Sequence, residues 1–284
     1  MTQLLLLRCL LALAPAPADL AATTVPEFVP PAGWVTAEST VAVESTNLPP
    51  GVTNGVHWHI DVDHTTGEIK YPVGWPRTAM VPKTGVFDWT DFDYLAFQVY
   101  TATSREALPH NPLNVGIRPA TGPAANFSIP AVKGQWVEMR IPIEDVPNAN
   151  NIKSVQWNIS ESSYKHLDKL DFVIADLKLL RYRRPAALEF RVTGRLLAAD
   201  AGYLVVGLHA VGIERGQELP VTLELRQGER PLGRVEATAC RGRQRLLVAW
   251  PDLPTGELAL VLLINGVETA TTPLTVISGP FAKD

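Results

Sequence analysis

Apolar and polar residues alternate along short runs between residue 40 and residue 182, and turn residues separate the runs. A period of two is typical of a β-strand with one buried face. The pattern predicts strands over residues 40–44, 56–62, 94–101, 113–118, 124–129, 135–141, 152–159 and 171–182. Since no segment longer than a turn or two has a helical period with caps, we expect an all-β protein.

The composition changes near Arg183, Arg184 and Pro185, because six of the seven Trp and seven of the eight Lys precede them. The remainder predicts strands over residues 187–197, 203–210, 219–227, 230–237, 244–250, 256–264 and 272–277. Seven short strands in about a hundred residues are typical of an immunoglobulin-like β-sandwich, although no Cys-Trp-Cys pattern of an antibody domain is present. We therefore expect one domain over residues 34–184 and an immunoglobulin-like sandwich over residues 185–284.

The first residues have the pattern of a signal peptide. Apolar runs at residues 4–7 and 10–14 precede Ala16-Pro17-Ala18, an A-x-A cleavage pattern, and the run is too short to span a bilayer. We expect a signal peptide over residues 1–18, an N-terminal arm over residues 19–33 and a secreted or periplasmic protein. Cleavage leaves Cys240 as the one cysteine, so no intrachain disulfide is expected, which suits a bacterial exported protein.

The net charge of the chain disfavours some classes of binding partner. The formal net charge is -4, and no basic stripe favours nucleic acid or an anionic membrane surface. Hydrophobic residues make up 46% of the 284 residues, enough for two ordinary domains with their own cores. A small neutral ligand or a polymer therefore remains as the partner to test.

The strand over residues 56–62 has two different faces. Trp58, Ile60 and Val62 lie on one side, whereas His57, His59 and Asp61 lie on the other. Imidazoles and carboxylates bind metals, transfer protons or hold polar ligands. One straight strand rarely supplies more than two metal ligands, and no other His has a spacing that completes a site, so a catalytic metal is disfavoured.

The same alternation places planar polar side chains on the outer faces of other strands. These residues are Gln98, Tyr100, Asn114, Arg118, Gln156 and Asn158, and with His57 and His59 we expect them to form one sheet face. Amides and guanidinium groups make bidentate hydrogen bonds to neighbouring hydroxyls, as a sugar requires. The alternative is an ordinary polar surface, or one covered by the second domain.

Two tryptophans are candidates for stacking on a sugar ring. Trp136 falls opposite the apolar side of its strand, and Trp75 lies in a loop between prolines. Trp75 could equally close one end of the sandwich as part of the core. Trp58 and Trp157 lie on apolar faces, and we expect them in the core.

Three motifs give the first domain a family resemblance. Asp93-Tyr94-Leu95, then Gly134-Gln135-Trp136, then the strand over residues 172–179 with Asp176 resemble the galactose-binding-like jelly rolls. Many carbohydrate-binding modules of secreted bacterial polysaccharide-degrading proteins belong to that group. The resemblance covers residues 34–182 and implies a jelly-roll β-sandwich.

The resemblance also implies a structural calcium ion at Asp176, with Glu38 or Glu44 as the expected partner. The alternative is that Asp176 ends a strand at a bulge and binds backbone amides. Calcium takes six or more oxygen ligands, so one aspartate alone does not define the site.

The sequence contains no nucleophile elbow, phosphate loop, Cys-His pair or H-E-x-x-H motif. We expect a secreted, non-catalytic carbohydrate-binding protein or accessory module whose partner is a polysaccharide or other glycan, with a separate catalytic subunit or a cell-surface protein as a further partner. One alternative is a jelly-roll polysaccharide lyase that uses His59, Tyr100 and Arg118. Others are a truncated glycoside hydrolase without its catalytic domain and a structural cell-surface protein without a ligand.

Overall fold

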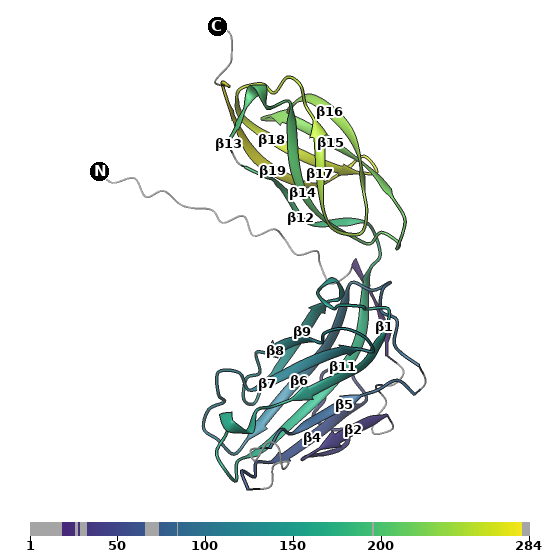
Figure 1. The fold of residues 1–284 in the computed structure, drawn as a ribbon, viewed down its shortest axis with the longest axis vertical. Coiled ribbons are helices and arrows are strands. Elements are labelled where there is room, and N and C mark those ends of the chain that lie inside the picture. Colours follow the sequence, from purple (N-terminus) through teal and green to yellow (C-terminus); the bar gives the residue numbers. More distant parts are fainter. Residues whose placement is uncertain are drawn as a thin grey trace, which may run out of the picture. The chain divides into compact units, whose positions relative to one another are not determined.

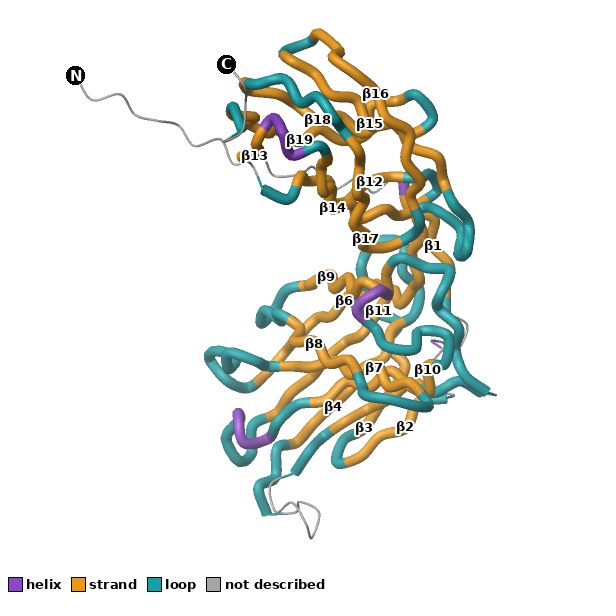
Figure 2. The backbone as a smooth tube through the Cα atoms, turned by 45° about the horizontal axis from the view of Figure 1, so that its top comes forward, coloured by secondary structure: helices purple, strands orange, loops and turns teal. Residues whose placement is uncertain are grey.

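The structure is a computed structural model that describes residues 19–25, 28, 33–65, 74–83, 85–194 and 196–279. The predicted signal peptide, residues 1–18, lies outside the described residues. Strands dominate, and the short 3-10 helices are η3 (Ile143–Asp145), η4 (Glu161–Ser163) and η5 (Ala199–Ala201) (Figure 2). The described residues include no helix with the length and hydrophobicity that a membrane crossing requires.

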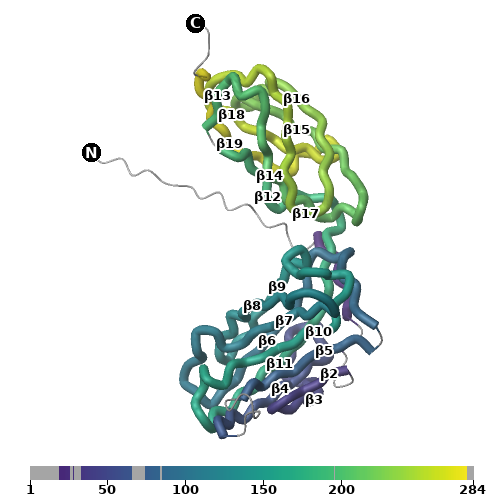
Figure 3. The backbone as a smooth tube through the Cα atoms, viewed as in Figure 1, coloured from purple at the N-terminus to yellow at the C-terminus, as the bar shows by residue number. Residues whose placement is uncertain are grey.

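The chain divides into two compact units, one of Ala21–Arg181 and one that begins at Tyr182 and includes Asp19 and Leu20. In Figure 3 the first unit runs from purple to teal, and the second from green to yellow. Each unit has its own buried cluster of hydrophobic residues. The protein is therefore all-β, with a jelly-roll β-sandwich followed by an immunoglobulin-like β-sandwich, as the sequence predicts.

Two sheets form the first sandwich (Figure 1). Sheet A has the order β3-β4-β11-β6-β9, with β1 also paired to β11, and sheet B has the order β2-β5-β10-β7-β8. The strands of sheet A are β1 (Leu20–Thr24), β3 (Thr40–Glu44), β4 (Gly55–Asp61), β6 (Tyr94–Thr103), β9 (Trp136–Pro142) and β11 (Lys169–Tyr182). The strands of sheet B are β2 (Trp34–Ala37), β5 (Arg77–Met80), β7 (Leu113–Pro119), β8 (Ala125–Ile129) and β10 (Ile152–Asn158).

Aromatic residues fill the space between these two sheets. Trp58 and Trp157 are fully buried, which confirms the prediction that they belong to the core. Trp157 of sheet B stacks on Trp34 with ring centroids 5.1 Å apart and meets Phe97 of sheet A edge-on at 5.6 Å. Burying such large rings removes much apolar area from water, so they dominate the energy of the core.

The second sandwich has a three-stranded sheet, β12-β14-β17, and a five-stranded sheet, β13-β19-β18-β15-β16. Its strands are β12 (Ala186–Val192), β13 (Leu196–Ala198), β14 (Tyr203–Val211), β15 (Leu219–Gln227), β16 (Arg230–Ala239), β17 (Gly242–Ala249), β18 (Gly256–Ile264) and β19 (Val267–Ile277). Strand β13 pairs with β19 in parallel, whereas the other pairs are antiparallel. Each predicted strand of this half overlaps an observed one.

Candidate functional site

The expected single face of polar side chains is divided between the two sheets of the first sandwich. His57, His59, Gln98, Tyr100 and Trp136 belong to strands of sheet A. The other strand-borne candidates are on sheet B, namely Asn114, Arg118, Gln156 and Asn158. Because the two sheets pack through their inner faces, their outer faces point in opposite directions. The prediction of one shared face is therefore wrong, and each face has to be considered alone.

The outer face of sheet B is rich in amides, and we call it the amide face. Its residues are Val35, Ala37, Arg77, Ala79, Asn114, Gly116, Arg118, Asn126, Ser128, Ser154, Gln156 and Asn158. One row crosses four strands, since Arg77 lies opposite Asn158, Asn158 opposite Asn114, and Asn114 opposite Ser128. The Ser128 hydroxyl donates to Asn114 Oδ1 at 3.1 Å. The five strands contain no carboxylate, and their one lysine, Lys153, is exposed at the register shift of β10.

Further along the amide face, two buried polar atoms have no hydrogen-bond partner among the described residues. Gln156 is only 8% exposed although it lies on an outer face, and it sits between Ala79 and Gly116 in register. Its Nε2 atom, like Nε of Arg118, is buried without a hydrogen-bond partner among the described residues. Buried donors are normally paired, so each unpaired one calls for an explanation such as a ligand or an ordered water.

Trp75 lies beside the same face. Its side chain is 40% exposed. Trp75 therefore does not close one end of the sandwich as part of the core, which was the alternative prediction. The Arg77 guanidinium lies 4.7 Å from the centroid of the Trp75 ring and donates to the Trp75 carbonyl at 3.1 Å. Since Arg77 begins the row described above, the indole stands at the edge of the amide face.

The outer face of sheet A has a different chemistry, and we call it the histidine face. His57 lies opposite Val173, Val173 opposite Tyr100, and Tyr100 opposite Trp136, which makes one row across four strands. The rings of Tyr100 and Trp136 are 5.6 Å apart and tilted by 46°. Trp136 thus packs beside Tyr100 and not near the amides of sheet B.

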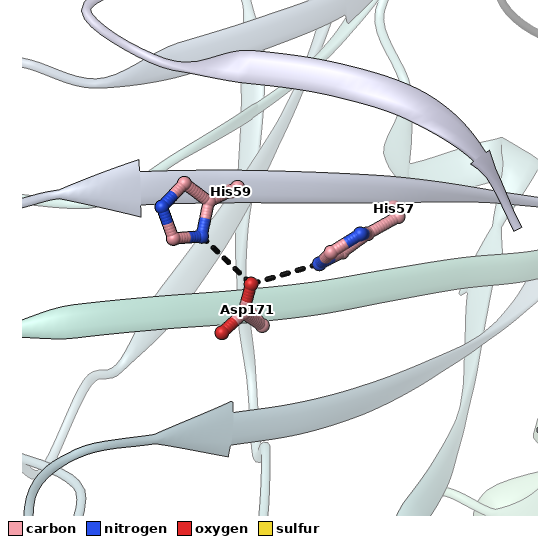
Figure 4. Close-up of side chains that lie close together, drawn as sticks. All are labelled: His57, His59 and Asp171. Atoms are coloured by element: carbon pink, nitrogen blue, oxygen red, sulfur yellow. Dashed lines mark hydrogen bonds and ion pairs between the residues drawn. The ribbon is translucent and has the colours of Figure 1, made fainter.

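His57, His59 and Asp171 form a cluster on the histidine face (Figure 4). His57 and His59 are two residues apart on β4, so their side chains share a face, and Asp171 of β11 lies opposite His59. Asp171 Oδ1 is 2.8 Å from His57 Nε2 and 2.7 Å from His59 Nδ1. His59 Nε2 is also 3.3 Å from Asp61 Oδ2. Sequence reasoning found both histidines but missed Asp171.

The cluster shifts the pKa values of its members. The hydrogen bond with Asp171 raises the pKa of His59 above its usual value, against the opposing effect of burial. Burial alone would raise the pKa of Asp171, but its hydrogen bonds with His59 and His57 outweigh burial and lower it. Between these two pKa values, His59 carries a positive charge beside a negative Asp171.

D171N is expected to lower the pKa of His59 towards its usual value of about 6.5. The measurement is made in the presence of a chelator, so that no metal ion occupies the imidazoles. Because the folded pKa of His59 exceeds the unfolded one, its ion pair stabilises the fold fully below about pH 6.5 and loses that effect as pH rises through the folded value. NMR titration of the His59 ring protons measures the shift. An unchanged His59 pKa in D171N would show that Asp171 does not control this imidazole.

The three carboxylates expected at the calcium site each have a hydrogen-bond or ion-pair partner of their own. Asp176 sits at a bulge of β11 with a φ of 54°, and its carboxylate pairs with Lys178 Nζ and accepts from Gln98 Nε2. Glu38 instead accepts the backbone N–H of Trp75, and Glu44 binds the Thr46 N–H and hydroxyl at 2.7 Å. None of these carboxylates belongs to a group of three metal-binding side chains among the described residues. The predicted ligand set and calcium binding both remain predictions.

The residues of the lyase alternative are also separated. His59 and Tyr100 are on the histidine face, whereas Arg118 is on the amide face of the other sheet. A general base must reach the proton that it abstracts while the other groups contact the same substrate. His59, Tyr100 and Arg118 therefore cannot act together in one cleft.

No protein-family model matches the chain. No curated protein sequence matches it either. Among solved structures it is similar to an exo-β-agarase, with 9% identity and a TM-score of 0.40 over 54% of this chain and 24% of the agarase. A carbohydrate-binding module, CBM28, specific for non-crystalline cellulose, matches with 15% identity and a TM-score of 0.34 over 52% of this chain and 86% of the module.

An immunoglobulin-like protein from Pseudomonas aeruginosa matches with 12% identity and a TM-score of 0.25, over 33% of this chain and 97% of that protein. The chain thus spans about a quarter of the agarase and most of the two smaller proteins. With TM-scores below 0.5, these likenesses say nothing of what the protein does.

Proposed function

We propose that the first sandwich binds a glycan on its amide face. The observation that supports this most is the row Arg77, Asn158, Asn114 and Ser128, with the unpaired, buried Nε2 of Gln156 in the next row. A neutral ligand with many hydroxyls both donates and accepts, and amide side chains do the same. The unpaired donors of Gln156 and Arg118 are buried, so they would gain ligand partners only if these side chains turned towards the surface on binding.

The size of the row favours a chain over a single sugar. Neighbouring strands lie about 4.8 Å apart, so four strands from Arg77 to Ser128 span about 14 Å. The Trp75 ring at one end offers an apolar plane on which the C–H face of a sugar packs. Amides in the middle and an aromatic at the edge suit a short run of neutral sugar residues.

The proposal is for a binding module and not for an enzyme. Hydrolysis of a glycoside uses two carboxylates that flank the bond, and the outward positions of sheet B supply none. The apolar runs at residues 4–7 and 10–14 support export to the outside of the cell, where polysaccharides are found. The second sandwich would then serve as a spacer or as the part that docks onto a cell-surface protein or a catalytic subunit.

The test is a glycan array of plant, algal and fungal polysaccharides, followed by affinity measurements on the glycans that bind. N158A and Q156A are each expected to weaken binding roughly tenfold, since one hydrogen-bonding side chain contributes about 1–1.5 kcal/mol. N158A should leave thermal unfolding nearly unchanged, because Asn158 is a half-buried surface residue.

The matched control is W136A on the histidine face, which should bind glycan as the wild type does. The proposal is wrong if no glycan on the array binds. It is also wrong if W136A loses binding while N158A and Q156A retain it, because the glycan would then occupy sheet A.

A further inference from the structure

Three potential ligand atoms of the histidine face lie close together. His57, His59 and Asp171 each offer one ligand atom, and these three atoms all lie within 4.8 Å of one another (Figure 4). Among the described residues, this is the one group of three or more such side chains with that spacing. The three side chains are 34–36% exposed, so an ion can reach them from solvent. Strands β4 and β11 together therefore supply three potential metal ligands, more than one straight strand usually supplies.

The hydrogen bonds of His59 show why a cation fits here. Its Nδ1 faces Asp171 and its Nε2 faces Asp61, so one imidazole lies between two carboxylates. A neutral imidazole has only one N–H to donate, so this arrangement suits either the imidazolium form, which donates from both nitrogens, or a metal ion in place of one of the two protons. If a metal ion occupies Nδ1, the proton sits on Nε2 and is donated to Asp61, and both nitrogens are satisfied.

Asp61 would then be the outer carboxylate that accepts a hydrogen bond from a metal-bound histidine. A metal-bound histidine usually donates its second N–H to a carboxylate, which fixes the ring orientation and the tautomer. Asp61 Oδ2 lies 3.3 Å from His59 Nε2, close to where such a partner belongs. This contact is independent of the three proposed ligand atoms.

We propose that His57, His59 and Asp171 bind a divalent transition-metal ion, with Asp61 as the residue that positions His59. Two imidazoles and one carboxylate suit zinc, copper(II) or nickel, whereas calcium prefers oxygen ligands alone. Ligands at about 2.1 Å in a tetrahedral zinc site are roughly 3.4 Å apart. The present N–O distances of 2.7 and 2.8 Å must therefore open by roughly 0.6–0.7 Å, which partly exposed side chains can do.

The site leaves a coordination position open. Three protein ligands on an outer sheet face leave the fourth position of a tetrahedral ion to water or to an external ligand. This proposal does not depend on glycan binding, because the amide face belongs to the other sheet.

The experiment uses the purified, tag-free protein after treatment with chelator. Calorimetric titration with zinc is expected to show one equivalent bound per chain, and cobalt is expected to give the visible absorption bands of a tetrahedral ion. H59A and D171N should lower the zinc affinity by more than tenfold. D61N should lower it about tenfold, since loss of an outer carboxylate typically costs 10–100-fold.

His64 provides the matched control, because it belongs to another histidine pair on the same sandwich. Its ring lies 5.9 Å from that of His166, and its backbone N–H donates to His166 Nδ1 at 3.2 Å. H64A should bind zinc as the wild type does. Equal zinc affinity in the wild type, H59A and D171N would overturn the proposal, as would loss of binding in H64A alone.

NMR of the histidine rings gives a readout that needs no variant to fold. On addition of zinc, the signals of His57 and His59 are expected to shift together and those of His64 and His166 to stay unchanged. Zinc-dependent shifts confined to His64 and His166, or no shifts at all, would show that the cluster does not bind the metal.

Discussion

W157A is expected to destabilise the first sandwich by about 3–5 kcal/mol, the usual cost of truncating a fully buried Trp to Ala. Trp157 is 0% exposed and contacts Trp34 of its own sheet and Phe97 of the opposite sheet. Removing the indole leaves a cavity between the sheets that their strands cannot close. Urea unfolding followed by circular dichroism measures the loss, and the transition of the second sandwich should not move.

The matched control is W136A, which removes the same side chain from an outer face. Trp136 is only partly buried, beside Tyr100, so its loss creates no closed cavity and costs much less. Similar losses of unfolding free energy in W157A and W136A would contradict the assignment of Trp157 to the centre of the core.

The residues of the core were predictable because the alternation of apolar and polar residues is a local property of each strand. In β10, Val155 and Trp157 alternate with Gln156 and Asn158, and this period of two alone tells which side chains share a side. Burial of Trp58 and Trp157 follows directly from it. Strand β5 was not predicted, because four residues, Arg77–Met80, are too few to show a period.

The composition of each face was not predictable in the same way. Alternation shows that His57 and Asn158 point away from the core, but it does not show which sheet holds each strand. That depends on pairing between distant segments, such as β10 with β7 and β6 with β9. Residues of similar chemistry were therefore assigned to one face although they lie on two.

Asp171 was missed for the same reason. It is 112 residues from His59 along the chain, and only the antiparallel register of β4 and β11 brings the two opposite each other. The strand over residues 171–182 was predicted, but its first residue has no local signal of a ligand. The pairing of strands, not the motif, creates the cluster.

The chain segment that carries Trp75 is held by two carboxylates. Glu161, at the start of η4, is 2% exposed, and its Oε2 accepts the Gly74 N–H at 2.8 Å while its Oε1 accepts the Asp63 N–H at 3.2 Å. Glu38 accepts the next N–H, that of Trp75. A Cβ atom on Gly74 would lie 2.5 Å from Glu161 Oε2, so only glycine lets the backbone approach this closely.

E161A is expected to lower the stability of the first sandwich by at least about 2 kcal/mol, because it leaves two backbone donors unpaired at about 1–3 kcal/mol each. It should also weaken glycan binding, since Gly74 no longer anchors the segment that presents the Trp75 ring. E161Q is the control. It should lose less stability and less glycan affinity than E161A, because its amide oxygen still accepts one of the two N–H groups. Thermal unfolding and the glycan titration measure both effects. If E161A unfolds at the wild-type temperature and binds glycan with wild-type affinity, Glu161 neither anchors this segment nor supports the site.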